Sequence, residues 1–194
     1  MSVPSLILAS GSAYRRELLA RLRIPFIAVS PSVDESRLHN EPPDRLVTRL
    51  SEAKTRALES EYPDSVIIGS DQVAVLNGQI LGKPGNRTNA IAQLQQCINR
   101  TVSFYTGLCV LNATNNKAEV CFEIFEVKFR NLTERQIEHY IDIDQPFDSA
   151  GSFKAESLGI ALFEHMRGDD PSSLIGLPLI RLTEMLNRAN IAIL

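Results

Sequence analysis

The sequence offers little from which a disulfide framework or a zinc site could be built. Its 194 residues include three cysteines and no tryptophan. The cysteines, Cys97, Cys109 and Cys121, lie twelve residues apart, with no CxxC pair and no nearby pair of histidines. This spacing predicts free, buried thiols in a reducing compartment rather than disulfides or metal ligands.

The sequence also lacks an excess of positive charge. Its formal net charge is −3, which argues against binding a nucleic acid polymer, so a small anionic ligand would need a locally basic pocket. The opening stretch MSVPSLILAS has no basic segment, and its apolar run is short. We therefore expect no signal peptide and no membrane span, and a cytoplasmic location.

The composition is typical of a globular protein that buries a sizeable core, because 44% of the residues are apolar and 22% are charged. A chain of this length predicts one domain over residues 1–194, with room for two lobes around a cleft. We see no internal repeat and no low-complexity tract.

Helical and strand patterns alternate in the first half of the chain, and long strands follow. We expect strands at 5–9, 26–29, 66–70, 72–75, 78–81, 101–112, 118–130 and 160–165. We expect helices at 12–23, 44–61, 87–98, 133–142 and 178–188. Residues 31–43 and 145–157 are expected to be loops, and Asn77-Gly78 the turn of a hairpin. This order predicts an α/β fold with a mixed sheet.

Two lysines stand in unusual places. Lys54 falls inside the apolar arc of the helix expected at 44–61, between Leu50 and Leu58. Such a lysine either extends its ammonium to solvent or meets a buried anion, and taken alone the first alternative is the commoner. Lys83 lies between a glycine and a proline on a short, stiff turn, where an exposed lysine is the ordinary alternative.

Two carboxylates join these two lysines as candidate site residues. Asp71 follows the strand expected at 66–70, where it either bonds its own backbone or faces a ligand at the strand's carboxyl end. Glu35 lies in a polar loop, where it is either plain surface charge or part of a site. Carboxylates hold a divalent metal and activate water, while lysines such as Lys54 and Lys83 neutralise a polyphosphate.

The segment Ser10-Gly11-Ser12 joins the first expected strand to the first expected helix. Small residues at a helix N-terminus offer free N–H groups to an anion, and Arg15 or Arg16 would add positive charge. The GxxxxGK[ST] spacing of a P-loop is absent. The alternative for either arginine is a solvated charge on the helix surface.

Eight motifs occur in a specific order between residues 6 and 180. They are LILASGSAYRRELL, VDE, SEAKTRAL, IIGSDQV, LGKP, YTGL, AGSFKAESLG and GDDPSSLIGLPL. In this order the chain resembles the Maf family of nucleotide pyrophosphatases, and within it the subgroup directed to 7-methyl-GTP. The resemblance implies an elongated mixed β-sheet with flanking helices around a central cleft, the Maf/Ham1 or ITPase-like fold, usually as a homodimer.

The resemblance also implies a reaction and a role for each residue of the cleft. The reaction is hydrolysis between the α- and β-phosphates of a modified nucleoside triphosphate, with Mg²⁺ or Mn²⁺ as the divalent metal cation. Asp71 matches the catalytic proton acceptor, and Glu35 and Asp71 match the metal-binding positions. The phosphate-binding positions are Ser10, Arg15, Lys54 and Lys83, with Lys154 as a further candidate. The positions that set base choice are Tyr14, Gln72 and Glu156.

The chemistry of the base-choice positions favours a cationic purine. Tyr14 would stack on the positively charged ring of 7-methylguanine, a contact worth roughly 0.5–2 kcal/mol. Glu156 is an acceptor when ionised and would take the N–H groups of the guanine edge. Two residues depart from the subgroup: Ala13 replaces the usual proline, and Tyr14 replaces the usual tryptophan.

Two other functions stay open. One is the same chemistry on dTTP, UTP or a broad range of nucleotides, and residues 14, 72 and 156 favour 7-methyl-GTP over it. The other is a non-catalytic nucleotide-binding regulator of septum formation, which the presence of every acid and lysine of the cleft disfavours.

Overall fold

The computed structural model describes residues 5–194 and contains one mixed sheet with helices on both faces. The strands are β1 (Ser5–Ala9), β2 (Ile27–Val29), β3 (Ser65–Leu76), β4 (Gln79–Leu81), β5 (Thr101–Asn112), β6 (Lys117–Phe129) and β7 (Phe163–Arg167). The helices are α1 (Ala13–Ala20), α2 (Pro43–Arg56), α3 (Arg87–Cys97), α4 (Glu134–Asp144), α5 (Pro171–Ile175) and α6 (Leu179–Arg188). Short 3-10 turns lie at Ala113–Asn115, Ala150–Ser152 and Leu158–Leu162.

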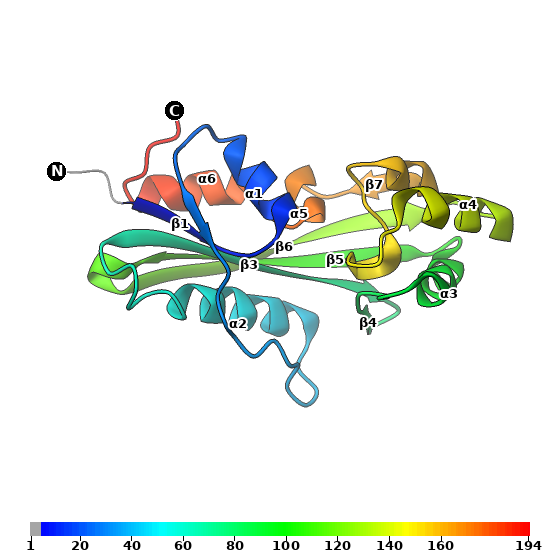
Figure 1. Cartoon of the computed structure of the whole chain (residues 1–194), viewed down its shortest axis with the longest axis horizontal. Helices are drawn as coiled ribbons and strands as arrows, with labels where there is room; N and C mark the ends of the chain where they lie inside the picture. The colour runs from blue at the N-terminus through cyan, green and yellow to red at the C-terminus, as the bar shows by residue number, and fades with distance from the viewer. Residues whose placement is uncertain (1–4) are drawn as a thin grey trace.

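The sheet is long and the molecule is elongated along it (Figure 1). The strand order is β2-β1-β3-β5-β6-β7, with β4 paired to the second half of β3. β1 is parallel to β2 and β3, whereas the remaining pairs are antiparallel. The α/β class and the mixed sheet expected from the sequence are therefore confirmed.

Three groups of helices surround this sheet. α2 lies along one face, and α1, α5 and α6 lie on the other (Figure 1). On that second face, α1 and α6 pack against β1 and the first half of β3 through Leu18, Leu19, Leu182 and Leu186. α3 and α4 pack with the second half of β3 and with β5 and β6 in a separate core cluster that contains Phe104 and Phe129. The two clusters leave the middle of β3 between them.

Along the middle of β3, no strand is paired on the side where β1 and β4 pair with its two ends, and this leaves a gap in the sheet. Pairing of β1 to β3 ends at Ala9 and Gly69, and pairing of β4 to β3 begins at Ala74 and Leu81. Residues 70–73 therefore have a strand neighbour on the β5 side only, among the residues that the structure describes. Because successive side chains of a strand point to opposite faces, this gap exposes both faces of β3 to one opening.

Asp71 lies inside a strand and not at the end of one. We expected a strand to end at residue 70, with Asp71 at its carboxyl end, but β3 runs unbroken from Ser65 to Leu76 and Asp71 pairs with Gly107. The polar run Ser70-Asp71-Gln72 gives the pattern of a strand end. It is tolerated inside the strand because it lies at the gap.

Other boundaries also differ. α2 ends at Arg56 instead of residue 61, and β7 begins at Phe163 because the residues before it form a 3-10 turn. α5 was not expected; Asp170 caps it with a side-chain hydrogen bond to Ser172 N. Five residues are too few for a helical period to be read from the sequence.

No helix within residues 5–194 combines the length and apolar character needed to cross a membrane.

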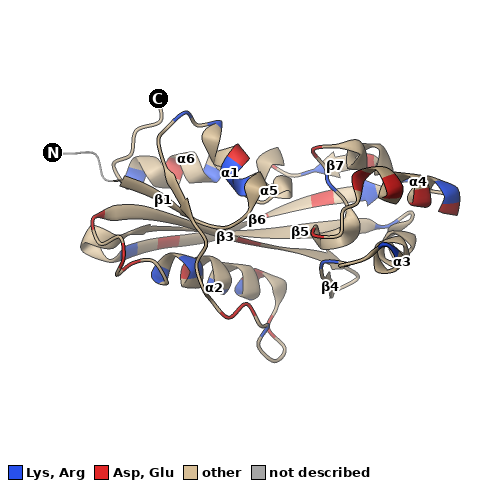
Figure 2. Cartoon of the chain, viewed as in Figure 1, with Lys and Arg blue, Asp and Glu red and all other residues tan. Residues whose placement is uncertain are grey.

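Charges of both signs are spread along the described chain. Figure 2 shows Lys and Arg interspersed with Asp and Glu, and α2 carries both. Most of the ion pairs join neighbouring surface residues, such as Arg188 with Glu119. This distribution agrees with the absence of a basic field in the sequence.

Two glycines set the distance between α2 and the sheet. A Cβ atom on Gly69 would lie 2.3 Å from the carbonyl oxygen of Ser51, and one on Gly107 would lie 2.2 Å from that of Val47. No side chain fits at either distance, so the helix backbone rests directly on β3 and β5. This close contact brings Lys54 of α2 within reach of Asp71.

Replacing Gly107 with alanine is expected to push α2 away from the sheet. Overpacking of this kind costs typically about 1–3 kcal/mol, and each kcal/mol lowers the Tm of a chain of this size by roughly 2–4 °C. Thermal unfolding followed by circular dichroism measures the effect. Gly82→Ala is the matched control, because a Cβ atom there meets nothing within 4 Å. Equal Tm values for both variants would contradict this account of the glycine.

Candidate functional site

A cavity of about 730 Å³ opens at the gap in the sheet. This volume lies in the range of small-molecule sites, roughly 300–1,000 Å³. Its walls come from the β1–α1 junction, the loop after β2, α2, the middle of β3, the turn after β4 and residues 148–156. Segments far apart in the sequence therefore meet around one opening.

Lys54 lies at the centre of one end of the cavity, joined to two carboxylates. Its Nζ atom is 2.6 Å from Asp71 Oδ1 and 2.8 Å from Glu35 Oε1. The lysine side chain is only 7% exposed. Of the two alternatives that the sequence left open for Lys54, the structure shows the buried ion pair.

The lysine controls the charge of Glu35. Its hydrogen bond to Glu35 lowers the pKa of that carboxyl below the usual value, and partial desolvation opposes this effect. Lys83 and Arg15 lower the same pKa further at longer range. Glu35 therefore stays ionised, although the loop that carries it leaves its side chain 60% exposed.

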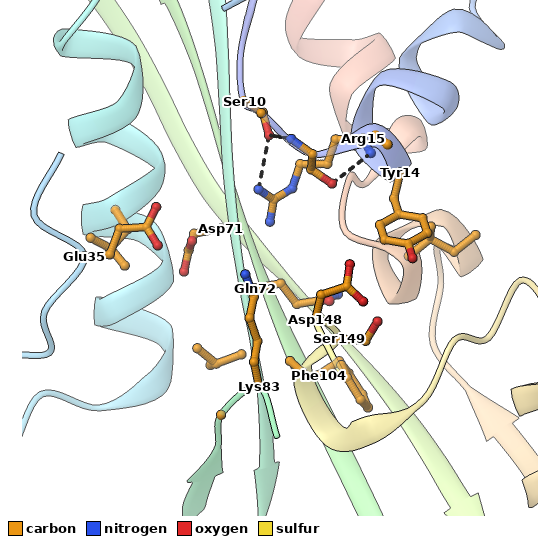
Figure 3. Close-up of a pocket in the computed structure, with 18 of the residues that line it drawn as sticks. Ser10, Tyr14, Arg15, Glu35, Asp71, Gln72, Lys83, Phe104, Asp148 and Ser149 are labelled. Carbon is orange, nitrogen blue, oxygen red and sulfur yellow. Dashed lines mark hydrogen bonds between the residues drawn. The ribbon is translucent and has the colours of Figure 1, made fainter. Parts of the chain in front are cut away.

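Arg15 enters the same end of the cavity from α1. The side chain of Ser12 caps α1 by accepting a hydrogen bond from Arg15 N, and this fixes where the helix begins. Arg15 Nε donates to the carbonyl of Gly176 at 2.9 Å, and Nη1 donates to Ser10 Oγ at 3.5 Å. Desolvation lowers the pKa of this guanidinium, and the charges of Asp71 and Glu35 oppose the change. Figure 3 shows the guanidinium between Ser10 and Asp71.

Gln72 lies on the face of β3 opposite to Asp71, where its side chain holds α5. Its Nε2 atom donates to Thr106 Oγ1 at 2.9 Å and to the carbonyls of Ser173 and Leu174 at 2.7 and 3.1 Å. Ser70 Oγ is also within hydrogen-bond distance of α5, 2.9 Å from the Gly176 carbonyl. The amide nitrogen of Gln72 is thus committed to the protein, which leaves its oxygen for any contact with a ligand.

The opposite end of the cavity is aromatic and acidic. Figure 3 shows Tyr14 near Asp148 and Ser149, away from Glu35 and Asp71. Glu156 also lines the cavity. Desolvation raises the pKa of Glu156, Asp144 adds to the rise, and Lys154 opposes it. Asp148 and Ser149 were not predicted as site residues, because their only signal in the sequence is their place in a polar loop beside AGSFKAESLG.

The remaining phosphate-binding candidates have different outcomes. Lys83 lines the cavity from its exposed turn, as the sequence allowed. Lys154 does not line it: its Nζ atom donates to the carbonyl of Asp144 at 3.0 Å, at the end of α4. The suggested contact of Lys154 with a phosphate is therefore wrong for this structure, because the side chain already caps a helix C-terminus.

The donor set at the Lys54 end fits a hard divalent cation. Glu35 and Asp71 supply carboxylate oxygens, while no cluster of three or more His, Cys, Asp or Glu side chains suited to a metal occurs within residues 5–194. Mg²⁺ characteristically binds through one or two carboxylates and keeps its other positions for water and substrate phosphates. Glu35 and Asp71 would hold such an ion, sharing their oxygens with Lys54.

Comparison with known proteins agrees with the resemblance seen in the sequence motifs. Residues 5–189 match the family model described as Maf-like protein. The 7-methyl-GTP pyrophosphatase of Nitrosococcus oceani is 52% identical over 191 residues, which cover 98% of this chain and 96% of that protein. The protein of the same name from Idiomarina loihiensis is 55% identical over 188 residues, covering 96% and 94%.

Among solved structures, the fold is similar to that of a HAM1 protein from Coxiella burnetii. The TM-score is 0.58, and the match covers 96% of this chain and all of that one. The sequences are 15% identical, so this likeness concerns the fold alone. It confirms the expected Ham1-like architecture.

Proposed function

The chain belongs to the family of Maf-like proteins, and from this premise we propose that it hydrolyses 7-methyl-GTP to 7-methyl-GMP and pyrophosphate. One observation carries the proposal. A buried lysine joins two carboxylates at one end of a cavity, and Tyr14 and the Asp148 carboxylate lie in the same cavity away from them. The first end suits a triphosphate and the second suits a cationic base.

The triphosphate binds near Arg15, Lys54 and Lys83. These side chains offset the charge that develops on the phosphate oxygens during the reaction. Glu35 and Asp71 would hold a divalent cation, which would supply further charge neutralisation there. Ser10 contributes by orienting the Arg15 guanidinium through its hydroxyl.

Asp71 acts as the general base. Lys54 occupies its Oδ1 atom, which leaves Oδ2 to orient a water molecule and accept its proton. The water oxygen forms a bond to the α-phosphorus, and the bond from that phosphorus to the bridging oxygen breaks. Pyrophosphate leaves with the electron pair of that bond, and 7-methyl-GMP is the other product.

The 7-methylguanine ring of the substrate binds between Tyr14 and Glu156. The Tyr14 ring stacks on the cationic purine. The Glu156 carboxylate accepts from the N–H groups of the guanine edge, and its charge favours the methylated base over plain guanine. Gln72, held in place by α5, contributes its side-chain oxygen.

Replacing Glu156 with glutamine is expected to reduce the preference for 7-methyl-GTP over GTP. Because the variant keeps the shape and loses the charge, kcat/KM for 7-methyl-GTP falls more than kcat/KM for GTP. A charge-assisted hydrogen bond is worth about 1.5–3 kcal/mol, so the ratio changes by roughly tenfold or more. Steady-state pyrophosphate release from both nucleotides measures it. Glu164→Gln, an exposed carboxylate on β7, is the control, and an unchanged ratio in Glu156→Gln would contradict the assignment.

We further propose that the protein is a cytoplasmic homodimer. Three free thiols support a reducing compartment.

The proposed dimer rests on an exposed part of β6. Phe122 and Ile124 on β6 are 39% and 42% exposed, and β7 pairs with β6 only from Glu126 onward. An apolar strip beside an unpaired strand edge is typical of an association surface. Sedimentation should give twice the 21.5 kDa of one chain, and a mass of one chain would contradict the dimer.

A further inference from the structure

The loop that carries Glu35 is fastened to α2 by a second ion pair, which lies outside the cavity. Arg49 Nε is 2.6 Å from Glu41 Oε1, and Nη2 is 2.8 Å from Oε2. Such two-pronged contacts fix the geometry of both partners. Arg49 Nη2 also donates to the carbonyl of Ser36, the residue that follows Glu35, at 3.1 Å.

Glu41 organises the loop from its other side. Its Oε2 atom accepts from Leu38 N at 3.1 Å, and its backbone carbonyl accepts from Arg37 Nε at 2.8 Å. The residue is only 7% exposed although it is charged. A buried carboxylate is costly unless it is paired, so Arg49 and Glu41 depend on each other.

Little else holds this loop. Residues 34–40 are all exposed. Among the residues that the structure describes, two side chains join residues 31–40 to α2 by hydrogen bonds or ion pairs. They are Lys54, through Glu35, and Arg49, through Ser36. Both lie on the same helix, which rests directly on the sheet at Gly69 and Gly107. The Glu35 carboxylate is thus placed relative to Asp71 from one rigid element.

We propose that Glu41 and Arg49 are a positioning pair for Glu35: they hold the loop so that its carboxylate reaches Lys54 and the end of the cavity that contains Asp71. The inference rests on the proposed function, in which Glu35 takes part in turnover. Neither residue of the pair lines the cavity, so neither is placed to contact a nucleotide bound there. Their effect passes through the backbone carbonyl beside Glu35.

The first test is Arg49→Met, with 7-methyl-GTP as substrate. Loss of a residue that orients a metal ligand typically costs about 10–100-fold in activity. We expect kcat to fall within that range, with little change in KM and an unchanged preference for 7-methyl-GTP over GTP. Arg49→Lys, which keeps the charge without the two-pronged geometry, should recover part of the loss. Arg56→Met on the same helix is the control, because Arg56 pairs with Glu52 and Glu59 instead.

A double-mutant cycle separates positioning from a general structural effect. If the pair acts through Glu35, adding Arg49→Met to Glu35→Gln lowers kcat no further than Glu35→Gln alone. If the two losses multiply, Arg49 acts independently of Glu35 and the proposal is overturned. Should Arg49→Met fail to fold, Glu41→Gln replaces it in the cycle, since the amide oxygen still accepts from Leu38 N.

Amide hydrogen exchange gives a readout that needs no substrate. The N–H of Leu38, bonded to Glu41 in the wild type, should exchange faster in Arg49→Met, while amides of β3 keep their rates. Unchanged exchange at Leu38 would overturn the proposal. A wild-type protein that releases no pyrophosphate from any nucleotide would defeat the proposed function alone, and the exchange result would still decide whether the pair fastens the loop.

Discussion

Replacing Asp71 with asparagine is expected to lower kcat for 7-methyl-GTP by about 10²–10⁴-fold, the usual contribution of a general base. Asparagine has the same shape, and its oxygen still accepts a hydrogen bond from Lys54, but it takes no proton from water. Binding of the nucleotide should change little, because the Arg15, Lys54 and Lys83 side chains remain. Rapid-quench turnover gives kcat, and titration with a non-hydrolysable α,β-methylene analogue gives the Kd.

Asp64→Asn is the matched control for this variant. Asp64 is exposed and immediately precedes β3, the strand that carries Asp71, but it lies outside the cavity. The control should keep the wild-type kcat. Equal kcat in Asp71→Asn and wild type would remove Asp71 from the role of base, and a parallel loss of nucleotide binding would point to a role in holding Lys54.

Replacing Lys54 with methionine is expected to have the second large effect. Methionine matches the length of the lysine stem but leaves Glu35 and Asp71 near each other without a cation. Removing one preorganised electrostatic contact to the transition state typically costs about 10²–10³-fold in rate. We therefore expect a fall of that size in kcat/KM for 7-methyl-GTP, with Lys117→Met, at the exposed first residue of β6, as the control.

The same variant should change how Glu35 titrates. In the wild type the hydrogen bond from Lys54 depresses the pKa of Glu35, so the attraction stabilises the fold above the unfolded-state pKa. That stability is lost as the pH falls through the folded-state pKa. In Lys54→Met the pKa of Glu35 should rise, which carboxyl NMR of the metal-free protein measures. A Glu35 pKa that stays low would mean that Lys83 and Arg15, not Lys54, set it.

Much of the fold was predictable because its elements carry clear local signals. The strand at Ser5–Ala9 is an apolar run, the hairpin turns at Asn77-Gly78, and Thr133 opens α4 with a capping box. The course of β3 was not predictable in the same way. Its polar centre is explained only by the absence of β1 and β4 beside it, which is a property of the assembled sheet.

The candidate site shows the same division. The sequence could name Lys54 as unusual but could not decide whether its ammonium reached solvent or an anion. That depended on Gly69 and Gly107, which let α2 approach the sheet. Asp148 lies in an irregular loop and Lys154 caps a helix, and neither position carries a periodic pattern that would reveal it. The catalytic roles of the cavity residues stay predictions that the variants above test.

The most direct test of the account is pyrophosphate release from 7-methyl-GTP, GTP, dTTP, UTP and CTP with Mg²⁺ or Mn²⁺, carried out in ¹⁸O-labelled water. We expect 7-methyl-GTP to be preferred over GTP, with the label appearing in 7-methyl-GMP because water attacks the α-phosphorus. A preference for dTTP or UTP would mean that Tyr14, Gln72 and Glu156 do not recognise a cationic purine. Release from none of the five would contradict catalysis and favour a nucleotide-binding regulator.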